Sequence, residues 1–483
     1  MYHITLINPF TFELDAGIDN FIENDFKYPT SEMVWDWRLK KHKYVSSVGF
    51  LFHNRCGNVF TFKIGWLPYI YYHYYAKLDE ESRILFESCK NDMKVNFNNL
   101  YDSQNEDLNY LLSMNRGIAT IYTGYGKTEC LATLINWIIN TRNETVLIIV
   151  PGDAAKKEIV DRLEDKYGIT TPYFDYSSNY NCIAVNGFLR SYQYDKSHPY
   201  WKTIDWIIAD EVEYTVTNAG IECIELCTNV KWMYGFSATP DKKEGARITI
   251  LPKNNKVVQR NSRLIDYFGF STVYKKPTGH DIKLVKIQTT QFNYLDVDKI
   301  KDTGYSEIVE TVLMDPRICN LIKKVSMTHK PMFIPINRLE IIDEWIHSYF
   351  TDDDVVVINL CGRGFEVYNS GVHIGNIDLR QVKEYLADGR VHVITGTKTA
   401  FRALDFQELN NVLPLSSSLA SNVLQYIGRI SRKRKYNIYQ LECNRYIPVY
   451  TNDLKKRNTL IKNYYSDCNI IQETRREVEY GIF

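Results

Sequence analysis

The sequence predicts an α/β protein with two similar lobes, each built on a parallel sheet. A small β-containing domain precedes the lobes and a short helical tail follows them. Its 483 residues, at roughly 150 per domain, suggest about three domains. Two blocks of the chain alternate short apolar runs with segments of helical period, which is the pattern of βαβ units. A connector punctuated by Pro277 and Gly279 separates the two blocks.

Composition excludes several classes of protein. With 45% hydrophobic and 24% charged residues, the chain lies far from disordered and fibrous compositions. The 58 basic and 58 acidic residues cancel, so any site for a polyanion must be local. No run approaches the roughly 20 apolar residues that span a bilayer, and the N-terminus lacks the basic start of a signal peptide. We therefore expect a soluble protein of the cytoplasm.

Cysteine spacing argues against two further classes. The ten cysteines are scattered and include no C-x-x-C pair. A disulfide framework and a zinc ribbon would both need a closer and more regular spacing. We expect reduced, buried thiols.

The N-terminal domain is expected to span residues 1–98. Its apolar and aromatic residues occur in short runs, and turn residues at 54–57 (NRCG) separate two of them, VGFLFH and NVFTFKIG. Such a turn between two apolar runs predicts a β-hairpin.

The two lobes are expected at 99–273 and 284–447, with a linker at 274–283 and a helical tail at 448–483. The tail has a helical pattern through Leu454, Leu460, Ile461 and Tyr464. Strands of the first lobe are predicted at 118–122, 146–150, 204–209 and 233–236, and its helices include 128–140 and 154–167. Strands of the second lobe are predicted at 332–336, 355–358, 391–394 and 412–415, and helices at 338–350, 379–387 and 420–431.

A glycine-rich turn follows the first predicted strand of lobe one. TGYGKT, residues 123–128, precedes a helical segment, and backbone N–H groups at such a junction wrap a phosphate. The leading glycine of the general P-loop pattern is absent, since position 121 is Ile. The alternative is a simple glycine turn with a solvated lysine. The residues expected to hold a triphosphate are Thr123, Gly124, Gly126 and Lys127, and Thr128 is expected to hold Mg²⁺.

A carboxylate pair follows a second apolar strand, 83 residues further on, counted as 210 − 127. Asp210 and Glu211 stand where a parallel strand ends, which is where Mg²⁺ and an attacking water need negative charge. We expect this strand to lie next to the strand that leads into the glycine-rich turn. Asp210 would support the metal and Glu211 would polarise the water. Alone, such a pair is more often a solvated loop.

Two further groups complete the candidate site. Ser237 and Thr239 follow the strand MYGF, and their hydroxyls would bridge the carboxylate pair to a neighbouring site and sense the γ-phosphate. In the second lobe, Gln425 precedes Arg429 and Arg432, which share a helix face and would point across the cleft between the lobes at the phosphate. The alternative for the arginines is a solvated basic face.

These strings, in this order, resemble the motifs of superfamily 2 helicases over roughly residues 100 to 445. Residues 123–128 resemble motif I, 210–213 motif II, 237–239 motif III and 425–432 motif VI. The resemblance implies two tandem RecA-like lobes and ATP hydrolysis with Mg²⁺. It also implies nucleic-acid-backbone contacts at Pro151, Gly152 and Thr397, a nucleotide contact at Asp405, and adenine recognition by Gln104.

Within this superfamily the chain resembles UvsW-type phage helicases, which remodel forked and branched DNA in recombination. The features are a W-D-x-R segment (Trp35, Asp36, Arg38), the run SLASNVLQYIGRISRKR, and the short helical tail. The chain departs from the superfamily at Glu213, where relatives carry His or Asp, at Gly152, where Thr is usual, and at Ala403, where Gly is common.

Local basic and aromatic segments offer surfaces for a polyanion. The segment after motif III is rich in Lys and Arg, and residues 38–43 (RLKKHK) are basic. Either a DNA-facing hairpin or a solvated loop fits the first segment. The tyrosine-rich run 69–75 would stack bases or, as the favoured interpretation, fill a core.

The function expected from this resemblance is an ATP-driven DNA helicase or branch-migration motor, placed in a bacterial cytoplasm if phage-encoded. Its partners would be single-stranded, forked or branched DNA, and replication or recombination proteins. An RNA helicase is the first alternative, and D-E-V-E together with Gln425 leans towards DNA. The second alternative is a nucleotide-gated binding module that does not separate strands, for which Glu213 is the main support.

Overall fold

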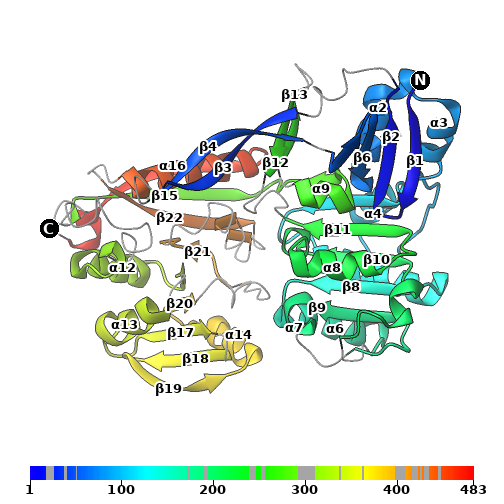
Figure 1. Cartoon of the computed structure of the whole chain (residues 1–483). Coiled ribbons are helices and arrows are strands. Elements are labelled where there is room, and N and C mark those ends of the chain that lie inside the picture. Colours follow the sequence, from blue (N-terminus) through cyan, green and yellow to red (C-terminus); the bar gives the residue numbers. More distant parts are fainter. Residues whose placement is uncertain are drawn as a thin grey trace. The chain divides into compact units, whose positions relative to one another are not determined.

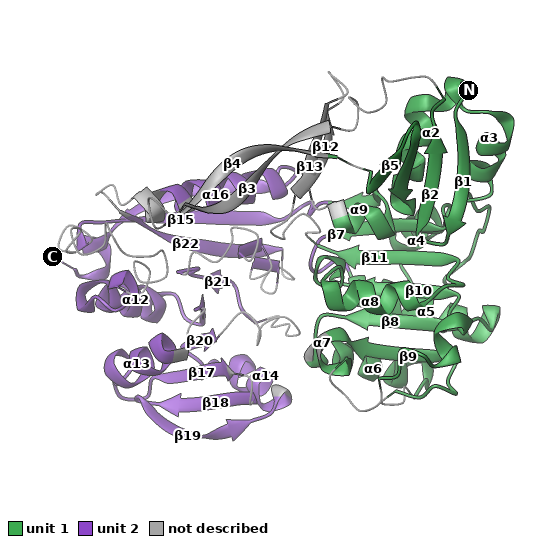
Figure 2. Cartoon of the chain, in the orientation of Figure 1, with its two compact units in different colours: residues 1–121, 126–275 green, residues 122–125, 276–483 purple. Residues whose placement is uncertain are grey.

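The computed structural model of the chain divides into two compact units (Figure 2). The first unit comprises residues 1–121 and 126–275, and the second comprises residues 122–125 and 276–483. The structure describes residues 1–17, 27–36, 41–50, 52–170, 174–189, 194–238, 246–251, 256–260, 262–291, 311–336, 339–361, 364–396, 408–415, 423–424, 427–428, 434–443 and 448–482.

A six-stranded parallel sheet forms the centre of the first unit (Figure 1). All four strands predicted for lobe one are present, and their apolar runs are buried because helices cover both faces of such a sheet. Two strands were not predicted, and they occupy the two edges of the sheet. The order is β14 (Ser271–Lys275), β7 (Arg116–Ile121), β11 (Trp232–Ser237), β10 (Trp206–Asp210), β8 (Val146–Val150) and β9 (Tyr180–Ala184).

The helices of this unit start and stop at residues suited to those positions. Thr217 caps α8 by accepting a hydrogen bond from the backbone N–H of Gly220. Gly168 ends α6 with φ of 66°, a left-handed conformation that favours glycine. The helices are α4 (Asp102–Leu112), α5 (Lys127–Trp137), α6 (Asp153–Tyr167), α7 (Val185–Phe188), α8 (Asn218–Leu226) and α9 (Ser262–Phe268), with shorter turns η3 (Ile138–Arg142), η4 (Pro199–Thr203) and η5 (Val212–Tyr214).

The N-terminal segment packs against the first lobe and belongs to the same unit. Its antiparallel sheet shares a core with Ile265 of α9, and Trp66 Nε1 donates a 2.7 Å hydrogen bond to Oδ1 of Asp266. A hairpin forms here as β5 and β6, with Gly57 in the turn at φ of 61°. Its first strand consists of residues 54–56, which were predicted to be the turn, so the turn lies further along the chain than expected. The elements are β1 (His3–Asn8), β2 (Thr11–Asp15), β5 (Asn54–Cys56), β6 (Val59–Lys63), η1 (Ile64–Trp66), α2 (Leu67–Tyr74), η2 (Tyr75–Lys77) and α3 (Glu80–Glu87).

The tyrosine-rich run divides between core and surface. Tyr69, Tyr71 and Tyr74 are buried, whereas Tyr72 and Tyr75 are 69% and 49% exposed. The run lies mainly on α2, where successive residues point in different directions around the helix. The core interpretation therefore holds for three of the five tyrosines.

Two separate two-stranded hairpins carry the basic segments. β3 (Lys27–Asp36) pairs with β4 (Lys41–Phe50), and β12 (Ala246–Leu251) pairs with β13 (Lys256–Arg260). The segment after motif III therefore contains a hairpin. Arg38 lies outside the described residues.

A nine-stranded mixed sheet forms the centre of the second unit (Figure 1). β17, β18 and β19 are antiparallel, and the other neighbours are parallel. The order is β19 (Val372–Ile377), β18 (Gly364–Asn369), β17 (Val356–Cys361), β20 (Val393–Gly396), β16 (Met332–Pro335), β21 (Asn411–Val412), β22 (Lys435–Cys443), β15 (Asp281–Thr289) and β23 (Asn469–Arg476). The helices are α12 (Pro316–Thr328), α13 (Leu339–Tyr349), α14 (Leu379–Ala387) and α16 (Pro448–Tyr464), followed near the C-terminus by the turn η9 (Glu477–Tyr480).

The C-terminal tail contains more than the predicted helix. After α16, β23 joins the sheet in parallel with β15. Glu477 then accepts hydrogen bonds from the hydroxyls of Thr289 and Thr290, each at 2.5 Å. The tail is therefore part of the second lobe's sheet. The NIIQETRR sequence of β23 alternates weakly, which explains why it did not predict a strand.

The irregular connection between the lobes is shorter than the predicted linker at 274–283. β14 continues to Lys275 and β15 begins at Asp281, which leaves residues 276–280. Across the described part of the chain, no helix has the length and apolar character needed to cross a membrane.

Candidate functional site

The turn between β7 and α5 has two glycines in left-handed conformations. Gly124 has φ of 98° and Gly126, which precedes the first residue of α5, has φ of 99°. A Cβ at position 126 would also lie 2.5 Å from Nε2 of Gln104. Side chains strongly disfavour both the conformation and the contact. The glycine-rich turn predicted from the sequence is therefore formed at a junction of strand and helix.

Lys127, the first residue of α5, is held between two carboxylates. Its Nζ lies 2.6 Å from Oε1 of Glu211 and 2.9 Å from Oδ1 of Asp210. Burial by itself would lower the pKa of Lys127, but the negative charges of Asp210 and Glu211 outweigh burial and raise it. The ammonium group therefore remains protonated at neutral pH.

The carboxylate pair carries more negative charge than Lys127 neutralises. Asp210 is the last residue of β10 and is 9% exposed, and Glu211 follows it with φ of 44°. Burial raises the pKa of Asp210, the Lys127 charge opposes this effect, and the Glu211 charge adds to it. A buried site of this kind is stabilised by an additional cation.

Strand order corrects one sequence-based expectation and explains a contact. The strand that carries Asp210 was expected beside the strand of the glycine-rich turn, but β11 lies between β10 and β7. Because β11 is the middle strand, its last residue, Ser237, reaches the carboxylate pair. Its hydroxyl donates a 3.4 Å hydrogen bond to Oε2 of Glu211. Ser237 thus bridges to the pair, as its position after a strand predicted, while Thr239 lies outside the described residues.

Thr128 contacts a residue that the sequence did not indicate. Its hydroxyl donates a 3.1 Å hydrogen bond to Oε1 of Glu158, which lies on α6. The hydroxyl proton is therefore committed to Glu158, and the oxygen lone pairs of Thr128 stay available. Glu158 was missed because it belongs to the next βα unit and stands in no motif.

The oxygen donors of the site fit Mg²⁺. Asp210 and Glu211 supply carboxylates and Thr128 supplies a hydroxyl, which are ligands that Mg²⁺ prefers. Among the described residues, no group of three or more His, Cys, Asp and Glu forms a ready metal cage. Proteins usually bind Mg²⁺ through one or two carboxylates plus substrate phosphates.

Gln104 lies beside the glycine-rich turn. It is only 3% exposed, and its Oε1 accepts a 3.1 Å hydrogen bond from the backbone N–H of Tyr101, capping α4. Its Nε2 approaches Gly126 closely. The structure therefore brings Gln104 to the site from a segment 22 residues before Gly126, counted as 126 − 104.

The departures from the helicase pattern have different structural settings. Gly152 follows β8 with an extended φ of −178°, and a Cβ there would meet nothing within 4 Å. Position 152 therefore accepts any small residue, and Pro151 lies next to it. Glu213 is fully buried in η5, so it faces the protein interior.

Several predicted site residues of the second lobe lie outside the described residues. They are Thr397, Asp405, Gln425, Arg429 and Arg432. Gly428, from the same motif as the two arginines, is described. Gly428 lies close to Thr123 within the second unit. A Cβ added at position 428 would come within 2.4 Å of the Thr123 Cβ.

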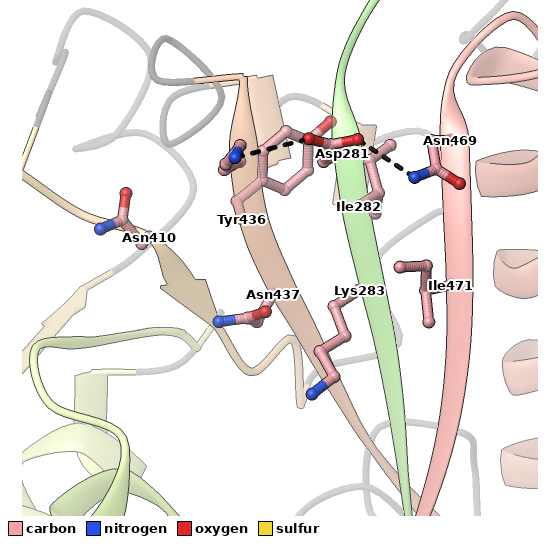
Figure 3. Close-up of a pocket in the computed structure, with 9 residues that line it drawn as sticks. Asp281, Ile282, Lys283, Asn410, Tyr436, Asn437, Asn469 and Ile471 are labelled. Atoms are coloured by element: carbon pink, nitrogen blue, oxygen red, sulfur yellow. Dashed lines mark hydrogen bonds and ion pairs between the residues drawn. The ribbon is translucent and has the colours of Figure 1, made fainter.

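A separate pocket of about 470 Å³ lies in the second unit (Figure 3). It is lined by the first residues of β15, β22 and β23, at the amino ends of these parallel strands. Asp281 there accepts a 3.1 Å hydrogen bond from Asn469 and pairs with Lys435 at 3.9 Å. Its charges are thus paired internally.

The first unit is defined by a glycine-lysine turn and an Asp-Glu pair at the carboxyl edge of one parallel sheet, which is the arrangement of a RecA-like P-loop lobe. A second α/β unit follows it in the chain. The chain therefore has two tandem RecA-like α/β lobes.

Comparisons with solved structures find helicases at low identity. T4 UvsW is 14% identical, with 99% of each chain covered and a TM-score of 0.38. Dbp5 of S. cerevisiae bound to RNA and ADP BeF3 is 13% identical, with 79% of this chain and 90% of that chain covered and a TM-score of 0.49. Helicase Lhr of Mycobacterium smegmatis bound to ssDNA and AMP-PNP is 13% identical, with 76% of this chain and 48% of that chain covered and a TM-score of 0.44.

No protein-family model and no curated protein matches the chain. Function is therefore inferred from the residues of the site.

Proposed function

We propose that the protein is an ATP-driven DNA helicase or translocase that remodels forked and branched DNA in phage replication, recombination or repair. One observation carries the proposal: Lys127, Asp210, Glu211 and Ser237 meet at the carboxyl edge of one sheet. A cation, a carboxylate for a metal and a carboxylate for water are the parts that hydrolysis of a nucleoside triphosphate requires.

Bound MgATP supplies the phosphoryl group and the free energy for movement. Lys127 would exchange its two carboxylate partners for the β- and γ-phosphate oxygens, which the raised pKa of Lys127 allows because the amine stays charged. Thr128 and Asp210 would hold Mg²⁺, and Glu158 keeps the Thr128 hydroxyl oriented.

Loss of the Lys127 contact would leave Glu211 able to polarise water. Oε1 of Glu211, now 2.6 Å from Lys127 Nζ, would accept a proton from that water. Ser237 holds the other carboxylate oxygen, so it would orient Glu211 and link hydrolysis to the end of β11. Thr239 is proposed to share this coupling role.

The remaining nucleotide contacts are proposed from the sequence pattern. Thr123, Gly124 and Gly126 would present backbone N–H groups to the phosphates. Gln104 would contact adenine, since it already lies at Gly126. In the second lobe the proposed nucleotide contacts are Asp405 and Gln425, and the proposed transition-state arginines are Arg429 and Arg432.

The nucleic-acid partner is proposed to be DNA. Pro151, Gly152 and Thr397 are the proposed backbone contacts, which bind phosphates without reading sequence. D-E-V-E in motif II and Gln425 in motif VI favour DNA over RNA. Replication and recombination proteins are proposed partners.

A panel of nucleic acids tests this function. ATP hydrolysis and strand separation would be measured with single-stranded DNA, forked DNA, a mobile four-way junction and RNA. We expect the branched DNAs to give the largest stimulation, with strand separation that needs ATP. Greater stimulation by RNA would support the RNA helicase instead, and ATP-dependent binding without strand separation would support a nucleotide-gated binding module.

A further inference from the structure

A second pocket, of about 560 Å³, lies in the first unit. We call it the aromatic pocket, because Tyr69, Tyr72, His73, Tyr110 and Phe270 are among its lining residues. It is bordered by α2, by the end of α4 and by the residues that begin β7 and β14. Its size is within the range of pockets that bind small ligands.

The aromatic pocket is distinct from the candidate nucleotide site. Arg116 and Ser271, the first residues of β7 and β14, line it. The glycine-rich turn follows the other end of β7, about 20 Å away for a six-residue strand. No residue assigned to nucleotide or Mg²⁺ lines this pocket.

Two exposed tyrosines from different helices line it. Tyr72 of α2 is 69% exposed and Tyr110 of α4 is 63% exposed. Tyr110 also lines a neighbouring hollow of about 630 Å³ along α4, which shares Asn91, Asp92 and Ser113 with the aromatic pocket. The two hollows therefore adjoin each other at these shared residues.

Two buried donor groups on residues that line the pocket lack acceptors. Nδ2 of Asn91 and Nε of Arg116 are buried and have no hydrogen-bond partner among the described residues. Buried donors of this kind cost free energy until an acceptor is supplied. Every nucleobase offers carbonyl or ring-nitrogen acceptors on its edges and a flat face for stacking.

The charge of the rim favours a base over a phosphate. Lys90 is paired with Glu87 at 2.8 Å, and Asp92 adds a negative charge. The guanidinium group of Arg116 already donates hydrogen bonds to the backbone carbonyls of Tyr267 and Pro9. A phosphate site would need an excess of cations, whereas an uncharged base needs only stacking and donors.

We propose that the aromatic pocket binds an unpaired nucleobase of a DNA strand, stacked on Tyr72 or Tyr110. The inference rests on the proposed function, since it assumes a nucleic-acid substrate. It adds a base-holding site at the junction of the N-terminal segment and the first lobe.

The test uses the full chain and strands that carry the fluorescent base 2-aminopurine at successive positions. Variants are Tyr72→Ala, Tyr110→Ala and Tyr72→Phe, with Tyr75→Ala as the matched control, because Tyr75 is exposed in the same run but does not line the pocket. We expect quenching at one or two positions in the wild-type protein. Tyr72→Ala and Tyr110→Ala should lose that quenching and weaken strand binding about tenfold, while Tyr72→Phe and Tyr75→Ala stay close to wild type.

Three results would overturn the inference. The first is equal quenching and affinity in Tyr72→Ala and Tyr75→Ala, and the second is unchanged affinity for a strand with an abasic site at the quenched position. The third is binding of free 2-aminopurine riboside as tight as that of the strand, which would mark a small-molecule site. DNA-independent ATP hydrolysis should stay unchanged in all variants. Failure of the wild-type protein to bind any strand would refute the proposed function itself.

Discussion

Lys127 and Glu211 lie 84 residues apart in the chain, yet Nζ of the lysine is 2.6 Å from Oε1 of the glutamate. The contact joins the helix after β7 to the end of β10, across the intervening strand β11. Lys127 and the two carboxylates thus neutralise one another in part. The phosphates of the proposed nucleotide would replace the carboxylates as partners of Lys127. The variants below follow from this relationship and from the packing around it.

Replacing Lys127 by Ala should abolish ATP turnover. The substitution removes the cation from two buried carboxylates and from the proposed phosphate contact, so we expect a fall in kcat of about 10²- to 10³-fold. Phosphate release under saturating ATP measures it. Lys231→Ala is the matched control, because Lys231 pairs with Asp205 at 2.9 Å on the surface with a 60% exposed side chain. Equal turnover in the two variants would refute the site.

Replacing Glu211 by Gln should separate binding from hydrolysis. The amide keeps the size of the side chain but accepts a proton poorly, so ATP should bind while turnover falls by about 10²-fold or more. A fluorescent ATP analogue reports binding, and phosphate release reports turnover. Glu158→Gln serves for comparison, since it changes a partner of Thr128 and leaves Glu211 in place. Turnover near wild type in Glu211→Gln would assign the base elsewhere.

Replacing Gly126 by Ala should weaken nucleotide binding about tenfold, because a left-handed conformation costs a side chain roughly 1–2 kcal/mol. The new Cβ would also lie 2.5 Å from Nε2 of Gln104. The double variant with Gln104→Ala relieves that contact but not the φ of 99°, so it should recover binding only in part. Gly187→Ala, with open space around its Cβ, should bind nucleotide normally. Normal binding by Gly126→Ala would contradict the assigned turn.

Replacing Asp266 by Asn should remove a pH dependence of stability. Burial raises the pKa of Asp266 from 3.8 to about 7. The folded chain therefore binds a proton that the unfolded chain releases, and this stabilising contribution is full at low pH and is lost as pH rises through 7. Between about pH 5 and pH 7, the wild-type free energy of unfolding should fall by about 2 kcal/mol more than that of the variant. Urea unfolding of both proteins across this range measures the difference, and parallel curves would contradict it.

Much of the fold followed from local pattern. The apolar runs at 146–150 and 233–236 became β8 and β11, because a strand buried on both faces needs continuous apolar residues. β9 was missed although most of it is buried, because its short sequence, YNCIA, includes the polar Asn181. β14 was missed at a sheet edge, where burial is less complete and the apolar pattern is weaker. β23 was missed for the same reason.

Some residues of the candidate site were also predicted from local sequence pattern, and others were not. Gly124, Gly126, Lys127, Asp210 and Glu211 were found from the sequence, because a phosphate turn and a metal carboxylate need particular residue types at strand ends. Glu158 was not found, since the sequence of α6 does not indicate which of its acidic residues faces Thr128.

The sequence by itself determined which residues have the chemistry for phosphate and metal, because that chemistry depends on side-chain type and on local backbone geometry. Only the tertiary structure decided that β11 lies between β7 and β10, that Ser237 therefore reaches Glu211, and that Tyr72 and Tyr110 line one pocket. Strand order and helix packing are set by long-range burial of apolar faces. The sequence of a single strand or helix does not specify which neighbouring element will cover it.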